Sequence, residues 1–333
     1  MTIDLAIGTF AVGAAVSLGT SWVLVSRLER IGERLRLSDA LLGILAALAA
    51  DTPEITAAVT ALPRHERVVG AGVVIGSNVF NLAALLGLGA VVAGRIGLHR
   101  KVVALGGVVA LWVAIMCLLT VAGVAEAPTG LGLVLTVLVP FVVILGGQRT
   151  RLRRLALPGR VATWLASAVD EEELELVVAI RPKRGRPRDV LEEVAALAVV
   201  VGASVTMERG VSSLGRHFGV ADVIIGGLVL TAVTSLPNAM AAVYLARKGR
   251  GAAALSTALN SNNLNVLAGL LIPAVAIGLA RPSGQELVVA GSYVGRTVLV
   301  LALAYAERGL RRWAGWLILA VYGAFVLSLI AIS

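Results

Sequence analysis

Two acidic residues and a proline lie within an otherwise apolar stretch near the start of the chain. Asp51 and Glu54 flank Pro53 between the apolar runs LLGILAALAA and ITAAVTAL. An ionisable side chain within such a bilayer-spanning segment costs roughly 2.5 to 3.5 kcal/mol on insertion scales, so its presence indicates a function. Carboxylate oxygens are ligands for hard cations such as Ca²⁺ and Na⁺. The stretch therefore predicts a cation site.

Pro53 also breaks the helix that carries these acids. It has no N–H to give to the carbonyl of Ala49, and its ring crowds that turn. Irregular backbone at membrane depth is tolerated only where protein or a water-filled cavity satisfies its polar groups. The break therefore adds free carbonyl oxygens beside the two carboxylates.

A related pattern occurs in the second half of the chain, where Pro237 is followed by Asn238. Pro53 and Pro237 each lie 24 positions before the serine of a Ser-Asn-x-x-Asn group, Ser77 in the first half and Ser261 in the second. An internal repeat with a polar, proline-broken helix in each half is typical of secondary transporters built from inverted repeats.

The composition is that of a polytopic membrane protein. Of 333 residues, 58% are hydrophobic and 15% are charged, and the mean hydropathy is +0.91, which is too apolar for an ordinary soluble domain. The net charge of +9 does not indicate nucleic-acid binding, because the basic residues lie between the hydrophobic segments.

The apolar segments predict an all-α membrane protein with ten transmembrane helices, arranged as two inverted five-helix repeats with proline-broken core helices. About 20 apolar residues span a bilayer. The ten segments are 3–25, 38–62, 68–94, 102–121, 129–147, 190–207, 220–246, 251–280, 287–305 and 313–332. They divide the chain into a first repeat (1–147), a loop (148–189) and a second repeat (190–333). An odd number of spans in each repeat gives the two halves opposite orientations.

The distribution of Lys and Arg predicts the orientation in a bacterial-type plasma membrane. Every second loop carries at least three basic residues, and these loops include the long central one. Since basic loops stay in the cytoplasm, we expect the central loop inside and both termini outside. The acidic run 170–175 lacks the spacing of a calcium-binding loop and is interpreted as part of a solvated linker.

Four short strings surround the two proline breaks and the two Ser-Asn groups. They are AADTPE (49–54), GSNVFN (76–81), VTSLPN (233–238) and NSNNLN (260–265). They resemble the two α-repeats of the calcium/cation antiporter superfamily, which includes sodium/calcium exchangers and has patterns close to G-T-S-x-P-E and G-S-N-x-x-N. The resemblance, with the ten-span layout, extends over nearly the whole chain.

The resemblance implies that ions bind near the midplane between the second, third, seventh and eighth spans. It also implies that the first and sixth spans slide across this core to expose the site to each side in turn. The implied ligands are side chains from both halves and two backbone carbonyls: Glu54, Ser77, Asn81, Ser235, Asn238, Ser261 and Asn265, with the carbonyls of Ala50 and Thr234.

This chain departs from the family pattern in its acids. Asn238 stands where the family has an acid, and Asp51 replaces a serine, so one negative charge has moved to the first half. The sequence leaves the direction of Asp51 open. Two carboxylates facing the site would neutralise Ca²⁺, whereas one would favour a monovalent ion or a proton. In the second half, Asn260 replaces a glycine of the pattern.

Three functions remain open on these grounds. The first is a secondary antiporter that exchanges Ca²⁺ for Na⁺ or H⁺ without a cofactor. The second is a monovalent cation/H⁺ antiporter of the same fold, and the third is a non-transporting membrane protein with a degenerate site. A membrane hydrolase using Ser77 or Ser261 would lack an intramembrane His or Lys as its base. The expected partners are the lipid bilayer and small inorganic cations, not nucleic acid, and the sequence sets no oligomeric state.

Overall fold

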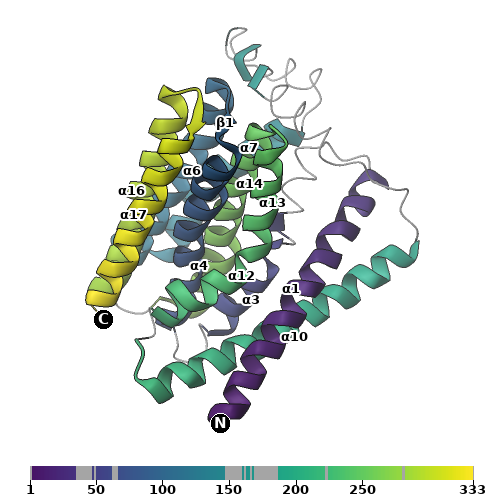
Figure 1. Cartoon of the computed structure of the whole chain (residues 1–333), viewed down its shortest axis with the longest axis vertical. Coiled ribbons are helices and arrows are strands. Elements are labelled where there is room, and N and C mark those ends of the chain that lie inside the picture. The colour runs from purple at the N-terminus through teal and green to yellow at the C-terminus, as the bar shows by residue number, and fades with distance from the viewer. Residues whose placement is uncertain are drawn as a thin grey trace.

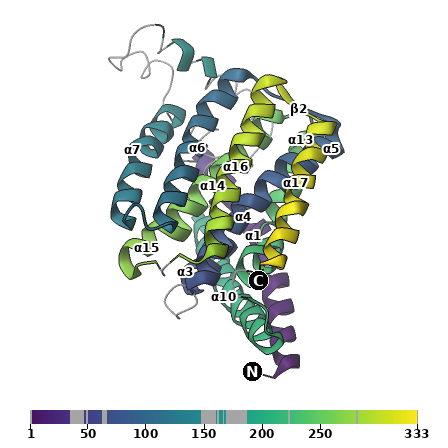
Figure 2. The same cartoon turned by 90° about the vertical axis from the view of Figure 1, so that its left-hand side faces the viewer.

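The structure is a computed structural model and describes residues 2–34, 47–48, 50–61, 67–146, 160, 163–165, 167–168, 187–221, 224–279 and 282–332. This part of the chain is almost entirely helical (Figures 1 and 2). Its elements, in which η marks a π-helical segment, are α1 (Ile3–Arg34), α3 (Thr52–Ala61), α4 (Arg67–Asn81), η2 (Leu82–Leu88), α5 (Gly89–Ala93), β1 (Arg95–Gly97), α6 (Arg100–Val121), α7 (Ala127–Gly146), α10 (Pro187–Phe218), η3 (Ile225–Leu230), α12 (Thr231–Thr234), α13 (Leu236–Arg247), α14 (Gly251–Leu264), η4 (Asn265–Leu271), α15 (Ile272–Ile277), α16 (Gly284–Ala306), β2 (Gly309–Arg311) and α17 (Arg312–Ala331).

Seven of the described helices are long and apolar enough to cross a bilayer, which makes the protein an integral membrane protein. An eighth crossing results if Ile225–Thr234 and Asn238–Arg247, which meet at 54°, form one broken span. The second predicted span, 38–62, lies partly outside the described residues. The full ten-span layout therefore stays a prediction.

The sixth predicted span, 190–207, was too short. α10 continues to Phe218, so Arg209 and Arg216, which follow the predicted span, lie within this helix. The charges end the apolar run but not the backbone hydrogen bonding, because arginine is a good helix former. Hydropathy thus marks where a helix leaves the apolar layer and not where it ends.

α1 and α10 cross each other closely on one flank of the molecule, opposite α16 and α17 (Figure 1). A Cβ on Gly13 would lie 2.7 Å from the main-chain nitrogen of Met207, and one on Gly210 would lie 2.7 Å from that of Phe10. The hydroxyls of Ser17 and Ser204 are 2.9 Å apart across the same contact. Small residues let the two backbones approach, as is common between membrane helices.

The centre of the bundle is formed by α3, α4, η2, η3, α12, α14 and η4, which pack against one another. α4 and η3 are in backbone contact, since a Cβ on Gly76 would lie 2.5 Å from the Cα of Gly227. Asn260 holds the equivalent motif position in α14, and there its Nδ2 donates a 3.0 Å hydrogen bond to Ser256 within the same helix. At this motif position, the close backbone approach that a glycine permits therefore occurs in the first half, at Gly76, where position 260 of the second half carries an asparagine.

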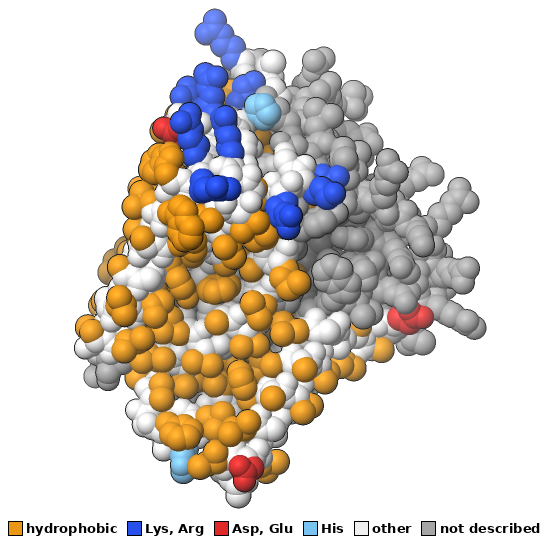
Figure 3. Space-filling model, in the orientation of Figure 1, with side chains coloured by type: hydrophobic (Ala, Val, Ile, Leu, Met, Phe, Trp, Pro, Cys, Tyr) orange, Lys and Arg blue, Asp and Glu red, His pale blue; other side chains and the backbone are white. Residues whose placement is uncertain are grey.

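A short antiparallel pairing of β1 with β2 joins the two halves at one end of the bundle. Arg95 lies opposite Arg311 in this pairing. Figure 3 shows that Lys and Arg gather at this end, above a broad band of hydrophobic side chains. This pattern is typical of a membrane protein with one basic, water-facing end.

Candidate cation site

Glu54 lies at the centre of the bundle and is fully buried. Its Oε1 accepts a 2.5 Å hydrogen bond from the hydroxyl of Ser235. Its Oε2 accepts a 2.6 Å hydrogen bond from Nδ2 of Asn265. Each oxygen of this carboxylate therefore has a donor from the other half of the chain.

Asp51 faces the same site, which answers the question that the sequence left open. Its side chain is fully buried. Its Oδ1 accepts hydrogen bonds of 2.5 Å from Nδ2 of Asn238 and of 2.7 Å from the hydroxyl of Ser261. Both carboxylates of the first half are thus held by polar groups of the second half.

The Ser-Asn-x-x-Asn groups of the two halves also bind each other. Nδ2 of Asn81 donates to the hydroxyl of Ser261 and to Oδ1 of Asn262, each at 3.1 Å. Asn78 and Asn262 exchange side-chain-to-main-chain bonds, with Nδ2 of Asn78 3.2 Å from the Asn262 carbonyl oxygen and Nδ2 of Asn262 3.1 Å from that of Asn78. These contacts bring together residues at least 180 positions apart in the chain.

The remaining predicted ligands lie at the same breaks and motifs. The hydroxyl of Ser77 donates to the carbonyl of Val73 at 2.7 Å, which leaves its oxygen able to act as an acceptor elsewhere. Ala50 and Thr234 are buried and directly precede Asp51 and Ser235, the residues at which the two helices are interrupted. The structure thus brings the predicted residues into one central region.

Backbone irregularities position these side chains. Ser235 forms a turn between α12 and α13, and Asp51 forms a turn before α3. η2 begins directly after Asn81, and η4 begins at Asn265, so a π-helical segment occurs at the same motif position in each half. Such segments often mark functional sites, because they rotate side chains out of α-helical register.

Three oxygens of the site are buried acceptors without a hydrogen-bond donor: Asp51 Oδ2, Asn81 Oδ1 and Asn265 Oδ1. An unsatisfied buried polar atom is costly, and one from a carboxylate is more so. All three atoms are oxygens, and the nitrogen donors of the same Asn81 and Asn265 side chains are paired. The unpaired atoms of Asp51, Asn81 and Asn265 are therefore all acceptors, which suits a cation.

The chemistry of the donor set favours a hard cation. Among the described residues, no three His, Cys, Asp or Glu side chains gather in a way that could hold a metal ion. The site offers carboxylate, amide and hydroxyl oxygens, which suit Ca²⁺ or Na⁺ better than Zn²⁺.

Sequence reasoning did not assign a role to Asn78 and Asn262. Each follows the serine of its motif, so the repeated Ser-Asn pair could have indicated a role for both asparagines. They connect the two halves, and Oδ1 of Asn262 also accepts a hydrogen bond from Nδ2 of Asn81.

A family model described as sodium/calcium exchanger protein matches residues 5–152 and 193–331. The chain belongs to this family. The two matched segments leave out residues 153–192.

Several relatives match parts or all of the chain. The sodium/potassium/calcium exchanger 4 of Mus musculus is 43% identical over 63 residues, which cover 19% of this chain and only 10% of that protein. The sodium/calcium exchanger MaX1 of Methanosarcina acetivorans is 26% identical over 157 residues, covering 45% of this chain and 43% of the relative. An uncharacterised membrane protein of Methanocaldococcus jannaschii is 24% identical over 330 residues, 98% of each chain.

Two solved structures share the fold. The sodium-calcium exchanger NCX_Mj has a TM-score of 0.60 at 20% identity and covers 98% of this chain and 99% of its own. The H⁺/Ca²⁺ exchanger CAX has a TM-score of 0.71 at 13% identity, covering 98% of this chain and 82% of its own. The predicted superfamily is confirmed by the family match together with these folds.

Proposed function

We propose that this protein is a secondary active cation antiporter that exchanges Ca²⁺ for Na⁺ or H⁺ by alternating access. The observation that carries the proposal is that three buried acceptor oxygens lack a donor: one belongs to the carboxylate of Asp51, and the other two belong to the amides of Asn81 and Asn265. A dehydrated cation would satisfy these oxygens, and its charge would balance the carboxylates.

The charge of the site supports a divalent ion. Asp51 and Glu54 both face the site, so two ionised carboxylates would neutralise one Ca²⁺. Amide and hydroxyl oxygens from Asn81, Ser77 and Asn265 would supply further ligands toward the six to eight that Ca²⁺ takes. The hydroxyls of Ser235 and Ser261, the amide oxygen of Asn238 and the carbonyls of Ala50 and Thr234 complete the proposed set.

We place the missing charge of the second half on Asp51. Asn238 stands where the family pattern has an acid, and its amide donates to the carboxylate of Asp51. The site thus keeps two carboxylates, although both now come from one half. This compensation favours the Ca²⁺ antiporter over a monovalent antiporter and over a degenerate, non-transporting protein.

The proposed architecture is the ten-helix inverted repeat, with the basic end and central loop in the cytoplasm. In it α1 and α10 move across the central bundle as one unit. Their close backbone contact at Gly13 and Gly210 supports joint movement, because neither helix can shift alone without separating that contact. The names of the solved exchangers that share the fold support Na⁺ or H⁺ as the counter-ion.

The test is uptake of radioactive Ca²⁺ into proteoliposomes that hold the purified protein, with an outward gradient of Na⁺, of H⁺ or of neither. We expect uptake that requires one of the gradients. Glu54→Gln should abolish it, whereas Glu126→Gln, which removes an exposed acid between α6 and α7, should leave it unchanged.

Each outcome decides between the alternatives. Uptake driven by one gradient names the counter-ion. Unchanged uptake in Glu54→Gln would contradict the proposed site. Absence of Ca²⁺ uptake in folded protein, with gradient-driven Na⁺ or K⁺ flux instead, would support the monovalent antiporter.

A further inference from the structure

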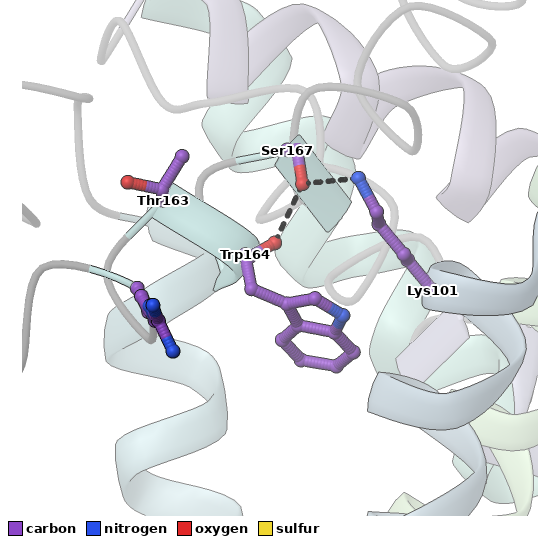
Figure 4. Close-up of a pocket in the computed structure, with 5 residues that line it drawn as sticks. Lys101, Thr163, Trp164 and Ser167 are labelled. Atoms are coloured by element: carbon purple, nitrogen blue, oxygen red, sulfur yellow. Dashed lines mark hydrogen bonds between the residues drawn. The ribbon is translucent and has the colours of Figure 1, made fainter.

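A cavity lies at the basic end of the bundle, away from the cation site. Its volume is about 440 Å³, and it is lined by Lys101, Arg160, Thr163, Trp164 and Ser167. Lys101 belongs to the first turn of α6, and the other four come from short helical stretches of the central segment (Figure 4). The volume is many times the ~30 Å³ share of one water molecule.

The charge of the lining is positive. Among the described residues, the lining contains one lysine and one arginine but no carboxylate. Neither cation forms an ion pair with another described residue; Arg311 and Glu307, at the same end, do form one. The cavity thus offers two cations to an anion, beside the hydroxyls of Thr163 and Ser167.

Lys101 is held in place by the protein. Its Nζ donates a 2.8 Å hydrogen bond to the hydroxyl of Ser167, which in turn donates a 2.8 Å bond to the carbonyl of Trp164 (Figure 4). An ammonium group has three protons, so two remain for a ligand. Fixing a flexible lysine in advance lowers the entropy lost on binding.

The position of the cavity points to a lipid. Lys101 is followed directly by the apolar run of α6, on which Val108 is 68% exposed. Trp164 lines the cavity and is 38% exposed. Tryptophan and lysine at the start of an apolar span are typical of the level of lipid headgroups. A ligand here would have its polar part against the cations and its glycerol region beside the indole.

We propose that this cavity binds the phosphate of an anionic phospholipid headgroup, held by Lys101 and Arg160 and covered by Trp164. Basic pockets at the cytoplasmic surface of membrane proteins bind such headgroups. Bound lipid would connect the central segment to α6, which packs against α14 and α16 of the second half. The proposal does not depend on which cation the central site carries.

The test is native mass spectrometry of the full-length protein in detergent, titrated with phosphatidylglycerol, phosphatidylcholine or inorganic phosphate. We expect phosphatidylglycerol to bind more tightly than phosphatidylcholine. The double variant Lys101→Gln/Arg160→Gln should weaken phosphatidylglycerol binding about 10- to 30-fold, from about 1 kcal/mol for each basic residue. It should leave phosphatidylcholine binding unchanged.

Two control variants make the result specific. Arg247→Gln/Arg308→Gln removes the same charge from exposed positions at the same end but outside the cavity, and should keep the affinity. Lys101→Arg keeps the charge and should also bind. Equal losses in both double variants, or none in Lys101→Gln/Arg160→Gln, would overturn the proposal. Displacement of the lipid by millimolar inorganic phosphate would show instead that the cavity serves a soluble phosphate.

Discussion

Nδ2 of Asn238 lies 2.5 Å from Oδ1 of Asp51, so an amide of the second half binds an acid of the first. Glu54, the other acid of the first half, is likewise bound by residues of the second half, Ser235 and Asn265. The negative charge of the site therefore comes from one half, and most of its donors come from the other.

This relationship predicts that the charge can be moved back. Asp51→Ser should raise the Ca²⁺ concentration for half-maximal uptake about 10- to 100-fold, because one of two carboxylates is lost. The double variant Asp51→Ser/Asn238→Glu should recover most of that loss, since it places an acid on the facing position. Calcium uptake into proteoliposomes measures both values.

The double variant is compared with Asp51→Ser and with Asn238→Glu alone. A double variant no better than Asp51→Ser, although it is folded and inserted, would show that Asp51 does not replace the acid at position 238.

The reciprocal bonds between Asn78 and Asn262 predict a stability effect at each position. Asn78→Ala and Asn262→Ala should each lower the free energy of unfolding by about 1 to 2 kcal/mol, since each removes hydrogen bonds between membrane helices. In the double variant the two losses should add to within about 0.5 kcal/mol, because each bond ends on a main-chain carbonyl that alanine keeps, so neither substitution removes the other bond. Unfolding in detergent measures all three variants. Losses no larger than that of the control Thr136→Val, on the exposed side of α7, would argue against the pairing.

The contact between α4 and η3 predicts that Gly76 tolerates no side chain. A Cβ there would meet the backbone of Gly227, so Gly76→Ala should lower the free energy of unfolding by about 1 to 3 kcal/mol. In α7, a Cβ at Gly132 would have no atom within 4 Å, so Gly132→Ala should change the free energy of unfolding by less than about 0.5 kcal/mol. Thermal unfolding of both variants tests the difference. Equal stability would mean that the two elements are further apart than the structure places them.

Arg296 predicts a third stability effect, away from the site. Its Nη2 donates a 2.6 Å bond to the carbonyl of Val321, and its guanidinium carbon lies 4.5 Å from the centre of the Phe325 ring. Lysine lacks the planar group that stacks in this way, so Arg296→Lys should lower the free energy of unfolding by about 1 to 2 kcal/mol.

The matched control is Arg311→Lys, at an exposed position that pairs with Glu307 at 3.1 Å. It should have little effect, because surface ion pairs contribute little. A destabilisation by Arg311→Lys as large as that by Arg296→Lys would refute the stacking argument.

The polar residues of the site could be found from the sequence because a membrane makes them conspicuous. Asp51 and Glu54 interrupt an apolar run, and Pro53 and Pro237 stand at the same distance from a repeated Ser-Asn motif. Helix ends were less predictable, as α10 shows, because a charged residue ends the apolar stretch without ending the helix.

By itself the sequence determined that the chain is a helical membrane protein with a repeated, proline-broken polar motif, since length, hydropathy and spacing are properties of the chain. Only the tertiary structure decided that Asp51 faces the site and that Asn78 binds Asn262. Gly43 precedes Glu54 by 11 positions, whereas Gly226 precedes Asn238 by 12. One residue along a helix turns a side chain by about 100°, so this offset left the direction of Asp51 undefined. Contacts such as that between Asp51 and Asn238, 187 positions apart, exist only once the two halves have packed together.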